Sequence, residues 1–471
     1  MTIEIRQQSS WRGALAFFKE AIRDNDSDFT KGPIKRALGL LAIPMVLEMS
    51  MESVFAVVDI AFVSRLGTNA VAAVGITEAL ITVLYAVAIG LGMGLTAMVS
   101  RRIGEKDPDA AAHVVGQAIW VGVLLSIVIG ALGATFAADL LFLMGAAPDV
   151  VEVGRGFTSV LLGGSASILF LFLLNAAFRG AGDAPVALRA LVVANSLNII
   201  LDPCLIFGLG PFPEMGVTGA AVATTIGRGI GVLYLLWYLL GAKGRLEFHL
   251  HHFKLRLAVL GRLLRVSIGG VGQFLVATAS WIVLMRIVAI YGSAPIAAFT
   301  IALRMIEFAL LPAWGLGNAA ATLVGQNLGA GEADRAEAIV RRAARYNLIF
   351  MTISGVMLVL FAPQIVGLFS NDEEILRYGI QCLRIFGLGY PLWAIGMIVV
   401  QALNGAGDTK TPTLLNLVCF WIIELPLAWT LAVHLSYGPV GVFWSTVIAE
   451  FTLTILGYRV FSKGKWKLQE V

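Results

Sequence analysis

Long apolar stretches separated by short polar ones set the pattern of this 471-residue chain. About 20 apolar residues suffice for a helix to cross the hydrocarbon core of a membrane. By this criterion we expect twelve spans and an all-α membrane protein. Their approximate ranges are 37–64, 70–100, 113–143, 153–178, 186–208, 215–241, 258–290, 295–326, 342–367, 375–403, 412–434 and 439–461.

The second half of the chain repeats the first. GAGD occurs at Gly180–Asp183 and again at Gly405–Asp408. With a small change in the offset, Gly216–Thr224 aligns with Gly438–Thr446. Both GAGD copies follow the fourth span of their half, so we expect two parallel six-helix lobes related by an axis along the membrane normal. The predicted domains are a cytoplasmic N-terminal segment (1–36), an N-lobe with helices 1–6 (37–241), a cytoplasmic linker (242–257), a C-lobe with helices 7–12 (258–462) and a cytoplasmic tail (463–471).

Basic residues collect in alternate loops. The loops after spans 3, 5, 7, 9 and 11 contain no Lys or Arg, whereas the other loops and both ends of the chain do. Arg65, Arg155 and Arg377, near the other ends of their spans, are exceptions. The positive-inside rule then places both termini in the cytoplasm. We therefore expect a multi-pass protein of the plasma (inner) membrane.

Composition indicates a polytopic membrane protein, and the sequence offers little support for an enzyme. The chain is 58% hydrophobic and 14% charged, whereas soluble domains are roughly 25% charged. Its three cysteines lie in apolar spans and offer no disulfide framework and no ligand spacing. No Ser/His or HExxH arrangement and no sizeable soluble domain is present. We expect no enzymatic activity, no cofactor and no nucleic-acid partner.

Three smaller motifs have competing interpretations. Ser10–Asn25 fits either an amphipathic helix on the membrane surface or a solvated tail. HLHH at His249–His252 could bind a metal, but with only Glu247 nearby and no cysteine we expect a solvated basic loop. Gly90–Gly94 resembles a phosphate loop superficially; it lies in an apolar helix without a preceding strand, which favours close helix packing.

Span 1 carries three acids, Glu48, Glu52 and Asp59. At about 100° per residue, their spacings of four and seven place them on one helix face. A carboxylate in hydrocarbon is costly, so this face should contact a cavity or polar neighbours. Pro44 removes a backbone hydrogen bond and makes the helix a candidate to bend. The pattern fits a cation-responsive helix of a transporter, or a satisfied structural cluster in a packed bundle.

Spans 5 and 6 add polar groups at a similar depth. Asn198 and Asp202 are four residues apart on one face of span 5, next to Pro203, and Thr224 lies in span 6. Two carboxylates, an amide and a hydroxyl suit Na⁺. They also suit a proton, because neighbouring carboxylates raise each other's pKa. The alternative is interhelical hydrogen bonding that only stabilises the lobe.

The repeat indicates that the acids are asymmetric. At an offset of 225 residues, Asp59 aligns with Leu284, and Glu52 aligns with Ala277. Acidic charge is therefore expected in one lobe only. Weaker C-lobe candidates near membrane depth are Gln273, Arg286, Arg304, Glu307, Gln401 and Glu424.

Taken together, these motifs resemble the multidrug and toxic compound extrusion (MATE) family over nearly the whole chain. The resemblance is carried by LAIP and VDIAFVSRLG in span 1, TAMVSRRIGEKD after span 2, FRGAGD after span 4, LDPCLIFG with GVTGAAVAT in spans 5 and 6, ATLVGQNLGAGEADRA after span 8 and LNGAGDTKTP after span 10. It implies an antiporter that exports amphipathic, often cationic, drugs and toxic compounds against inward flow of Na⁺ or H⁺. It also implies a V-shaped cavity between the lobes.

The N-lobe resembles the DinF-like branch of that family. The resemblance implies cation binding by Asp59, Asn198, Asp202 and Thr224, and bending of span 1 at Pro44 when the site is protonated. Asn175 matches a polar position that contacts substrate, and Glu52 falls where that branch has a polar residue. We assign Asn175, Glu52 and Glu48 to substrate binding. NorM-type members also have C-lobe acids in spans 7 and 10, where this chain has Ala277 and Trp393. Coupling should therefore rest on the N-lobe.

The predicted function is a cation-coupled antiporter that exports drugs, acts as a monomer and contacts membrane lipid. Its coupling ion is H⁺ or Na⁺, and we expect no metal apart from Na⁺ if that is the coupling ion. The alternative is a flippase for lipid-linked sugars, which would use a strongly basic central cavity. Arg286 and Arg304 keep this alternative open.

Overall fold

The computed structural model describes residues 2–23, 27–241 and 243–471, which form helices and no strand. Eleven helices are long and apolar enough to cross a membrane, and the bent pair α6 (Pro148–Gly163) and α7 (Ser165–Ala181) makes a twelfth span. The predicted all-α membrane fold is confirmed.

The N-lobe comprises the helices up to the linker. Besides α6 and α7 they are α2 (Ile34–Val63), α3 (Thr68–Gly104), α4 (Pro108–Thr135), α5 (Ala137–Leu143), α8 (Ala184–Phe207) and α9 (Val217–Leu240). The predicted third span divides into α4 and α5 at Phe136. The predicted fourth span bends by 41° between α6 and α7, where two glycines, Gly163 and Gly164, adjoin.

The C-lobe comprises the remaining helices. They are α10 (Leu257–Val288), α11 (Ser293–Gly329), α12 (Ala333–Gly367), α13 (Glu373–Gly405), α14 (Lys410–Asn416), α15 (Leu425–Trp429) and α16 (Pro439–Ser462). Two π-helical segments, Leu417–Glu424 and Thr430–His434, join α14 and α15 into one span, Lys410–His434. Short 3₁₀ helices lie at Ser64–Leu66, Leu250–Phe253, Ala289–Tyr291 and Lys465–Leu468.

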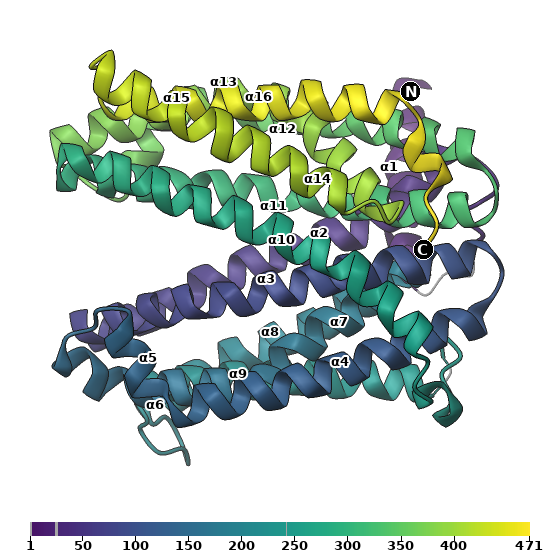
Figure 1. The fold of residues 1–471 in the computed structure, drawn as a ribbon, viewed down its shortest axis with the longest axis horizontal. Coiled ribbons are helices and arrows are strands. Elements are labelled where there is room, and N and C mark those ends of the chain that lie inside the picture. Colours follow the sequence, from purple (N-terminus) through teal and green to yellow (C-terminus); the bar gives the residue numbers. More distant parts are fainter. Residues whose placement is uncertain (1, 24–26, 242) are drawn as a thin grey trace.

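The two lobes lie side by side, with the purple and blue N-lobe below the green and yellow C-lobe (Figure 1). They meet through α2 and α3 on one side and α10 and α11 on the other. These helices lie together near the end that carries both termini and diverge toward the opposite end (Figure 1). The arrangement is that of a V with its apex at the end of the termini.

Glycines allow the helices to approach closely at this apex. A side chain at Gly90 of α3 would come within 2.3 Å of the Val271 amide nitrogen in α10. A side chain at Gly104 would come within 2.0 Å of the Gln326 carbonyl oxygen in α11. The predicted packing role of the Gly90–Gly94 motif is therefore confirmed.

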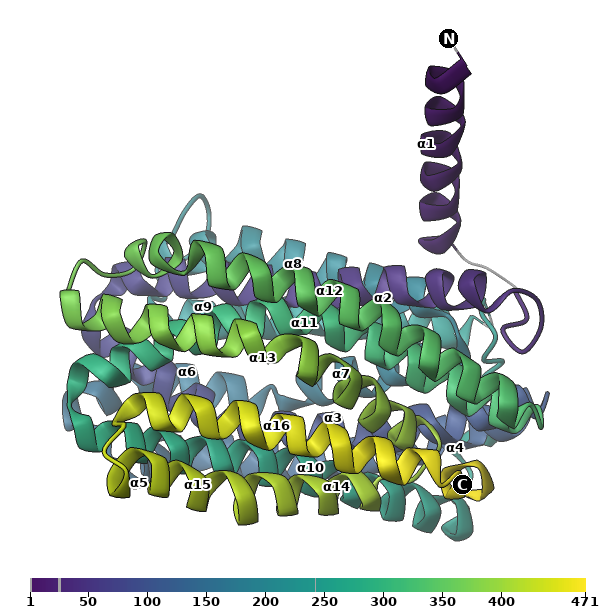
Figure 2. The ribbon, with the colours of Figure 1, turned by 90° about the horizontal axis from the view of Figure 1, so that it is seen from above.

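The N-terminal segment forms helix α1 (Thr2–Ala21), which projects sideways from the bundle (Figure 2). It is anchored at its end, where the Phe17 ring lies against Gly39 and Arg36 forms an ion pair with Glu20 at 2.5 Å. Part of the Ser10–Asn25 segment, including residues 24 and 25 and the Trp11 side chain, lies outside the described residues. The surface-helix interpretation stays a prediction.

The C-terminal tail bridges the lobes at the apex. Trp466 is buried and stacks on Phe461 at the end of α16, with ring centroids 4.8 Å apart. Beyond it, Arg101 and Arg102 of α3 donate hydrogen bonds to the carbonyl oxygens of Gln469 and Val471, both at 2.8 Å. The tail of the C-lobe is thus bound to the N-lobe.

Candidate functional site

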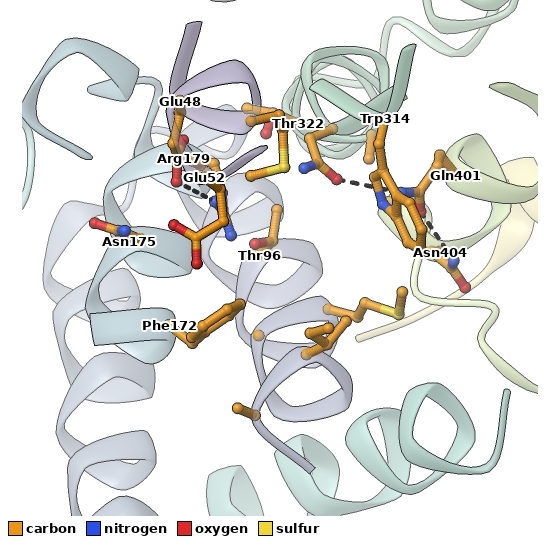
Figure 3. A pocket seen from close by; sticks show the side chains of 18 of the residues that line it. Glu48, Glu52, Thr96, Phe172, Asn175, Arg179, Trp314, Thr322, Gln401 and Asn404 are labelled. Carbon is orange, nitrogen blue, oxygen red and sulfur yellow. Dashed lines mark hydrogen bonds and ion pairs between the residues drawn. The ribbon is translucent and has the colours of Figure 1, made fainter. Parts of the chain in front are cut away.

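A cavity of about 220 Å³ lies between the lobes (Figure 3). The N-lobe lines it with α2, α3, α7 and α8, and the C-lobe with α10, α11 and α13. Much of the lining is aromatic or thioether side chain: Met49, Met93, Phe172, Phe274 and Trp314. Such a surface is adaptable and apolar, as expected for a site that takes amphipathic molecules.

The charged groups of the cavity come from the N-lobe. Glu48 and Glu52 of α2 and Arg179 of α7 line it. Arg179 forms an ion pair with Glu48 at 2.6 Å, and their facing side chains are visible in Figure 3. Among the ionisable lining residues there are thus two carboxylates and one guanidinium. Among its lining residues the cavity therefore has one more carboxylate than guanidinium.

The C-lobe wall of the cavity is polar but neutral. Gln401 of α13 donates to Asn318 of α11 at 3.2 Å and accepts from Asn404 at 3.1 Å. In Figure 3, Gln401 and Asn404 lie on the opposite side of the cavity from Glu48 and Glu52. The two walls therefore differ in charge while both offer hydrogen-bonding groups.

Several buried polar atoms at the cavity have no hydrogen-bond partner among the described residues. They are Glu48 Oε2, Asn175 Oδ1, Thr322 Oγ1 and Asn404 Oδ1. Buried polar groups normally find a partner, because leaving one unpaired costs free energy. These atoms are therefore available to a bound molecule or to water.

Glu52 also connects the cavity to the interior of the N-lobe. Its carboxylate lies 3.5 Å from the guanidinium of Arg228 in α9, which donates a hydrogen bond to the Tyr85 hydroxyl at 2.8 Å. Arg228 is only 5% exposed and lies over the Phe55 ring. Sequence reasoning missed Arg228, although it lies one helical turn after Thr224 and therefore on the same face of span 6.

The predicted cation-site residues Asn198, Asp202 and Thr224 do come together. All three are buried, on α8 and α9. With the amide oriented to satisfy both neighbours, Asn198 donates to Asp202 at 2.8 Å and accepts from the Thr224 hydroxyl at 3.1 Å. Pro203, inside α8, cannot donate a backbone hydrogen bond. The carboxylate therefore lies beside a weakened turn of the helix.

Asp59 approaches this group from α2. It interacts electrostatically with Asp202, Arg228 and Glu78, the last a residue of α3 that the sequence argument did not single out. Its Oδ1 atom is buried without a hydrogen-bond partner among the described residues. Asp59 therefore interacts electrostatically with the carboxylate of Asp202 and with the guanidinium of Arg228, while one of its own oxygens has no hydrogen-bond partner among the described residues.

The predicted residues thus fall into two connected groups. Glu48, Glu52 and Asn175 line the cavity. The Asp59–Asp202 group lies elsewhere in the N-lobe, and Arg228 interacts with both Glu52 and Asp59. The roles assigned to these residues stay predictions.

Pro44 lies inside a continuous α2. The residue after it contacts the C-lobe, because a side chain at Gly315 of α11 would come within 2.6 Å of the Met45 carbonyl oxygen. A bend at Pro44 would therefore change an inter-lobe contact.

The expectation that acidic charge belongs to one lobe only is wrong. Glu424 and Glu450 are 2% and 6% exposed in the C-lobe, and they interact electrostatically. The asymmetry holds between Asp59 and Leu284, and between Glu52 and Ala277. It fails in the last two spans, for which the alignment at an offset of 225 is out of register.

Two repeated lobes of membrane-spanning helices around a shared cavity define a membrane transport protein rather than an enzyme. Its family is shown by a profile comparison. The MatE profile matches residues 44–204 and 271–430, one match in each lobe. The chain belongs to the MatE family.

Curated relatives match nearly full length. The probable multidrug resistance protein YoeA of Bacillus subtilis is 28% identical, covering 94% of this chain and 96% of its own. The probable multidrug resistance protein NorM of Thermotoga maritima is 27% identical, covering 93% and 94%. An FAD transporter of Shewanella oneidensis is 28% identical, covering 84% and 88%.

Solved structures agree with the fold. An outward-facing multidrug resistance MATE family transporter aligns with a TM-score of 0.87 at 27% identity, covering 94% of this chain and 99% of its own. A transporter of the MOP superfamily from Pyrococcus furiosus aligns with a TM-score of 0.88 at 26% identity, covering 95% and 100%. Both support the two-lobed architecture.

Proposed function

We propose that the protein exports amphipathic cationic compounds in exchange for an inward-moving cation, H⁺ or Na⁺. The observation that carries the proposal is the central cavity, where aromatic and thioether side chains surround two carboxylates and a single guanidinium. Apolar walls favour flat organic molecules, and excess negative charge favours a cation. The names of the multidrug relatives support export of drugs.

Coupling to a cation is assigned to Asp59 and Asp202. In the empty state, Arg228 interacts with Asp59 as well as Glu52. A proton or Na⁺ at Asp59–Asp202 cancels negative charge there. Arg228 is then balanced chiefly by Glu52, and Glu52 becomes less available to a positively charged drug.

Cation and drug therefore compete through one shared guanidinium. This competition is a coupling free energy between two sites, and it works in both directions. Binding of the cation from outside would release the drug and shift the population of the two transporter states. A bend of α2 at Pro44 would pass the change to α11, which the same helix contacts.

The lipid-linked sugar flippase receives less support. Of its two candidate arginines, neither Arg286 nor Arg304 is among the described residues that line the cavity. The lining guanidinium, Arg179, is paired with Glu48. A phosphate headgroup would meet a net negative charge here, which disfavours binding.

The test is ethidium transport in membrane vesicles under an imposed Na⁺ gradient or an imposed pH gradient, one at a time. We expect one gradient to drive ethidium export by the wild type, and the Asp59→Asn variant to lose this response at normal expression. The exposed residue Asp149 supplies the matched control, Asp149→Asn, which should transport like the wild type. A full gradient response by Asp59→Asn would contradict the coupling assignment. Ethidium export driven by neither gradient would contradict the function.

A further inference from the structure

Three histidines and an aspartate converge where the inter-lobe linker crosses the start of α4. The ligand atoms of Asp109, His113, His251 and His252 all lie within 4.8 Å of one another. Asp109 and His113 are one turn apart on α4, and the other two belong to the 3₁₀ helix of the linker. The expectation of a simple solvated loop considered only Glu247 as a neighbour. The fold supplies two further candidate ligands from far away in the sequence.

His113 is a buried imidazole that is free to bind a metal ion. Its side chain is 3% exposed, and neither ring nitrogen has a hydrogen-bond partner among the described residues. A buried imidazole without partners is costly. Its Nε2 atom lies 3.8 Å from Asp109 Oδ2, which leaves room for an ion near both atoms after small side-chain movements.

His251 and Asp109 complete the set from the solvent side. His251 Nε2 lies 3.3 Å from Asp109 Oδ1, and these side chains are 58% and 63% exposed. An ion can therefore enter from solvent and reach the buried His113. Two imidazoles and a carboxylate match the preference of Zn²⁺ and related transition-metal dications.

His252 has a different hydrogen-bonding state. The backbone amide of His249 donates to His252 Nδ1 at 2.9 Å, so this nitrogen carries no proton. In the neutral ring the proton then lies on Nε2, which is 2.8 Å from Asp109 Oδ1 and donates to it. His252 in this state orients the carboxylate and leaves Asp109 Oδ2 to face His113.

We propose that Asp109, His113 and His251 form a binding site for a transition-metal dication of the Zn²⁺ class, with solvent as a further ligand and His252 as a positioning residue. The site fastens the linker to the N-lobe. Linker and helix already adhere there: Trp120 donates to the Phe253 carbonyl at 2.8 Å, and Gln117 donates to the Lys254 carbonyl at 3.1 Å. The bound ion adds a cross-link between α4 and the segment that leads into the C-lobe.

The test is a Co²⁺ titration of the full chain, purified in detergent without a polyhistidine tag and followed by visible absorption. We expect saturable binding of about one Co²⁺ per chain, displaced by Zn²⁺. Zn²⁺ should also raise the thermal unfolding temperature, because a ligand that binds the folded state stabilises it. Binding should be lost in the His251→Ala and His113→Gln variants. The exposed position of His251 makes its variant independent of any folding defect at His113.

Two further variants sharpen the assignment. His252→Ala should weaken binding by roughly 10- to 100-fold, the usual effect of a group that orients a ligand. His434→Ala, at an exposed position of the C-lobe, should bind like the wild type. Absence of saturable binding by the wild type would overturn the proposal. Wild-type affinity in both His113→Gln and His251→Ala would also overturn it.

Discussion

The last two spans of each lobe carry the same kind of polar pair in different surroundings. Asp202 and Thr224 of the N-lobe are answered by Glu424 and Thr446 of the C-lobe, each pair 222 positions apart. All four residues are buried. Thr446 makes a hydrogen bond to Glu424, whereas Thr224 bonds to Asn198, which in turn bonds to Asp202. The duplication therefore preserved a carboxylate and a hydroxyl in both halves.

The neighbours of the two pairs differ at two positions. At the same register, Phe420 stands in place of Asn198, and Glu450 in place of Arg228. The N-lobe thus combines its carboxylates with a guanidinium that also reaches the cavity through Glu52. The described C-lobe residues pair carboxylate with carboxylate, and their cavity wall is neutral. The two lobes therefore have different electrostatics, and among the described residues the N-lobe group is linked to the cavity through Arg228 and Glu52.

The largest predicted effect comes from removing the shared guanidinium. Arg228→Met leaves Glu52 and Asp59 without their buried counter-charge and the Tyr85 hydroxyl without its hydrogen-bond donor. Breaking a buried pair in this way costs about 3–5 kcal/mol. We expect a marked fall in the thermal unfolding temperature of the detergent-solubilised protein.

Glu450→Gln at the equivalent C-lobe position is the matched comparison. It removes one of two neighbouring carboxyl groups without breaking an ion pair, so the unfolding temperature should be unchanged or higher. Similar losses in both variants would show that the two lobes are electrostatically alike, against the comparison drawn above.

An intermediate effect is expected at the cavity wall. Glu52→Gln removes negative charge from the site and should weaken ethidium binding about tenfold, equivalent to about 1.4 kcal/mol. Gln401→Ala, on the neutral C-lobe wall, should change the affinity about twofold or less. Fluorescence titration of ethidium measures both. A larger loss at Gln401 than at Glu52 would locate the substrate contacts in the C-lobe.

Local sequence patterns were enough for the architecture. The length of the apolar spans predicts the helices, and the GAGD repeat predicts two similar halves. The small residues at Gly90–Gly94 predict close packing of their helix. These patterns therefore predicted the twelve spans, the repeat and the close packing of α3. The grouping of Asn198, Asp202 and Thr224 was also accessible, because helical spacing and depth fix which residues share a face and a level.

Pairings between distant helices were not accessible from one sequence. Arg179 follows the predicted fourth span directly, yet it reaches Glu48, which is 131 positions away. His252 and Asp109 are 143 positions apart, so no spacing rule connects them. Glu424 was only a weak candidate, and its neighbour Glu450 was missed, because the 225-residue register changes to 222 in the last spans.

The smallest effect is expected at the tail. Lys467 donates a hydrogen bond to Glu337 of α12, and this bond raises the pKa of Lys467 above its ordinary value of 10.5. A raised pKa means that the folded state favours the charged form, so the stabilisation is complete at neutral pH and declines as the lysine deprotonates. Lys467→Ala should lower stability by about 1 kcal/mol or less. The difference from the wild type should be constant through neutral pH and shrink above pH 10.5. A difference that grows in that range would contradict the pairing.

The central claim is that a cation acting at the N-lobe carboxylates drives export. The most direct measurement compares Asp202→Asn with its repeat equivalent, Glu424→Gln, for ethidium export from vesicles under the gradient that drives the wild type. We predict that Asp202→Asn loses the response to the gradient and that Glu424→Gln keeps it, at equal expression. Loss in Glu424→Gln with a normal response in Asp202→Asn would place coupling in the C-lobe and contradict the account.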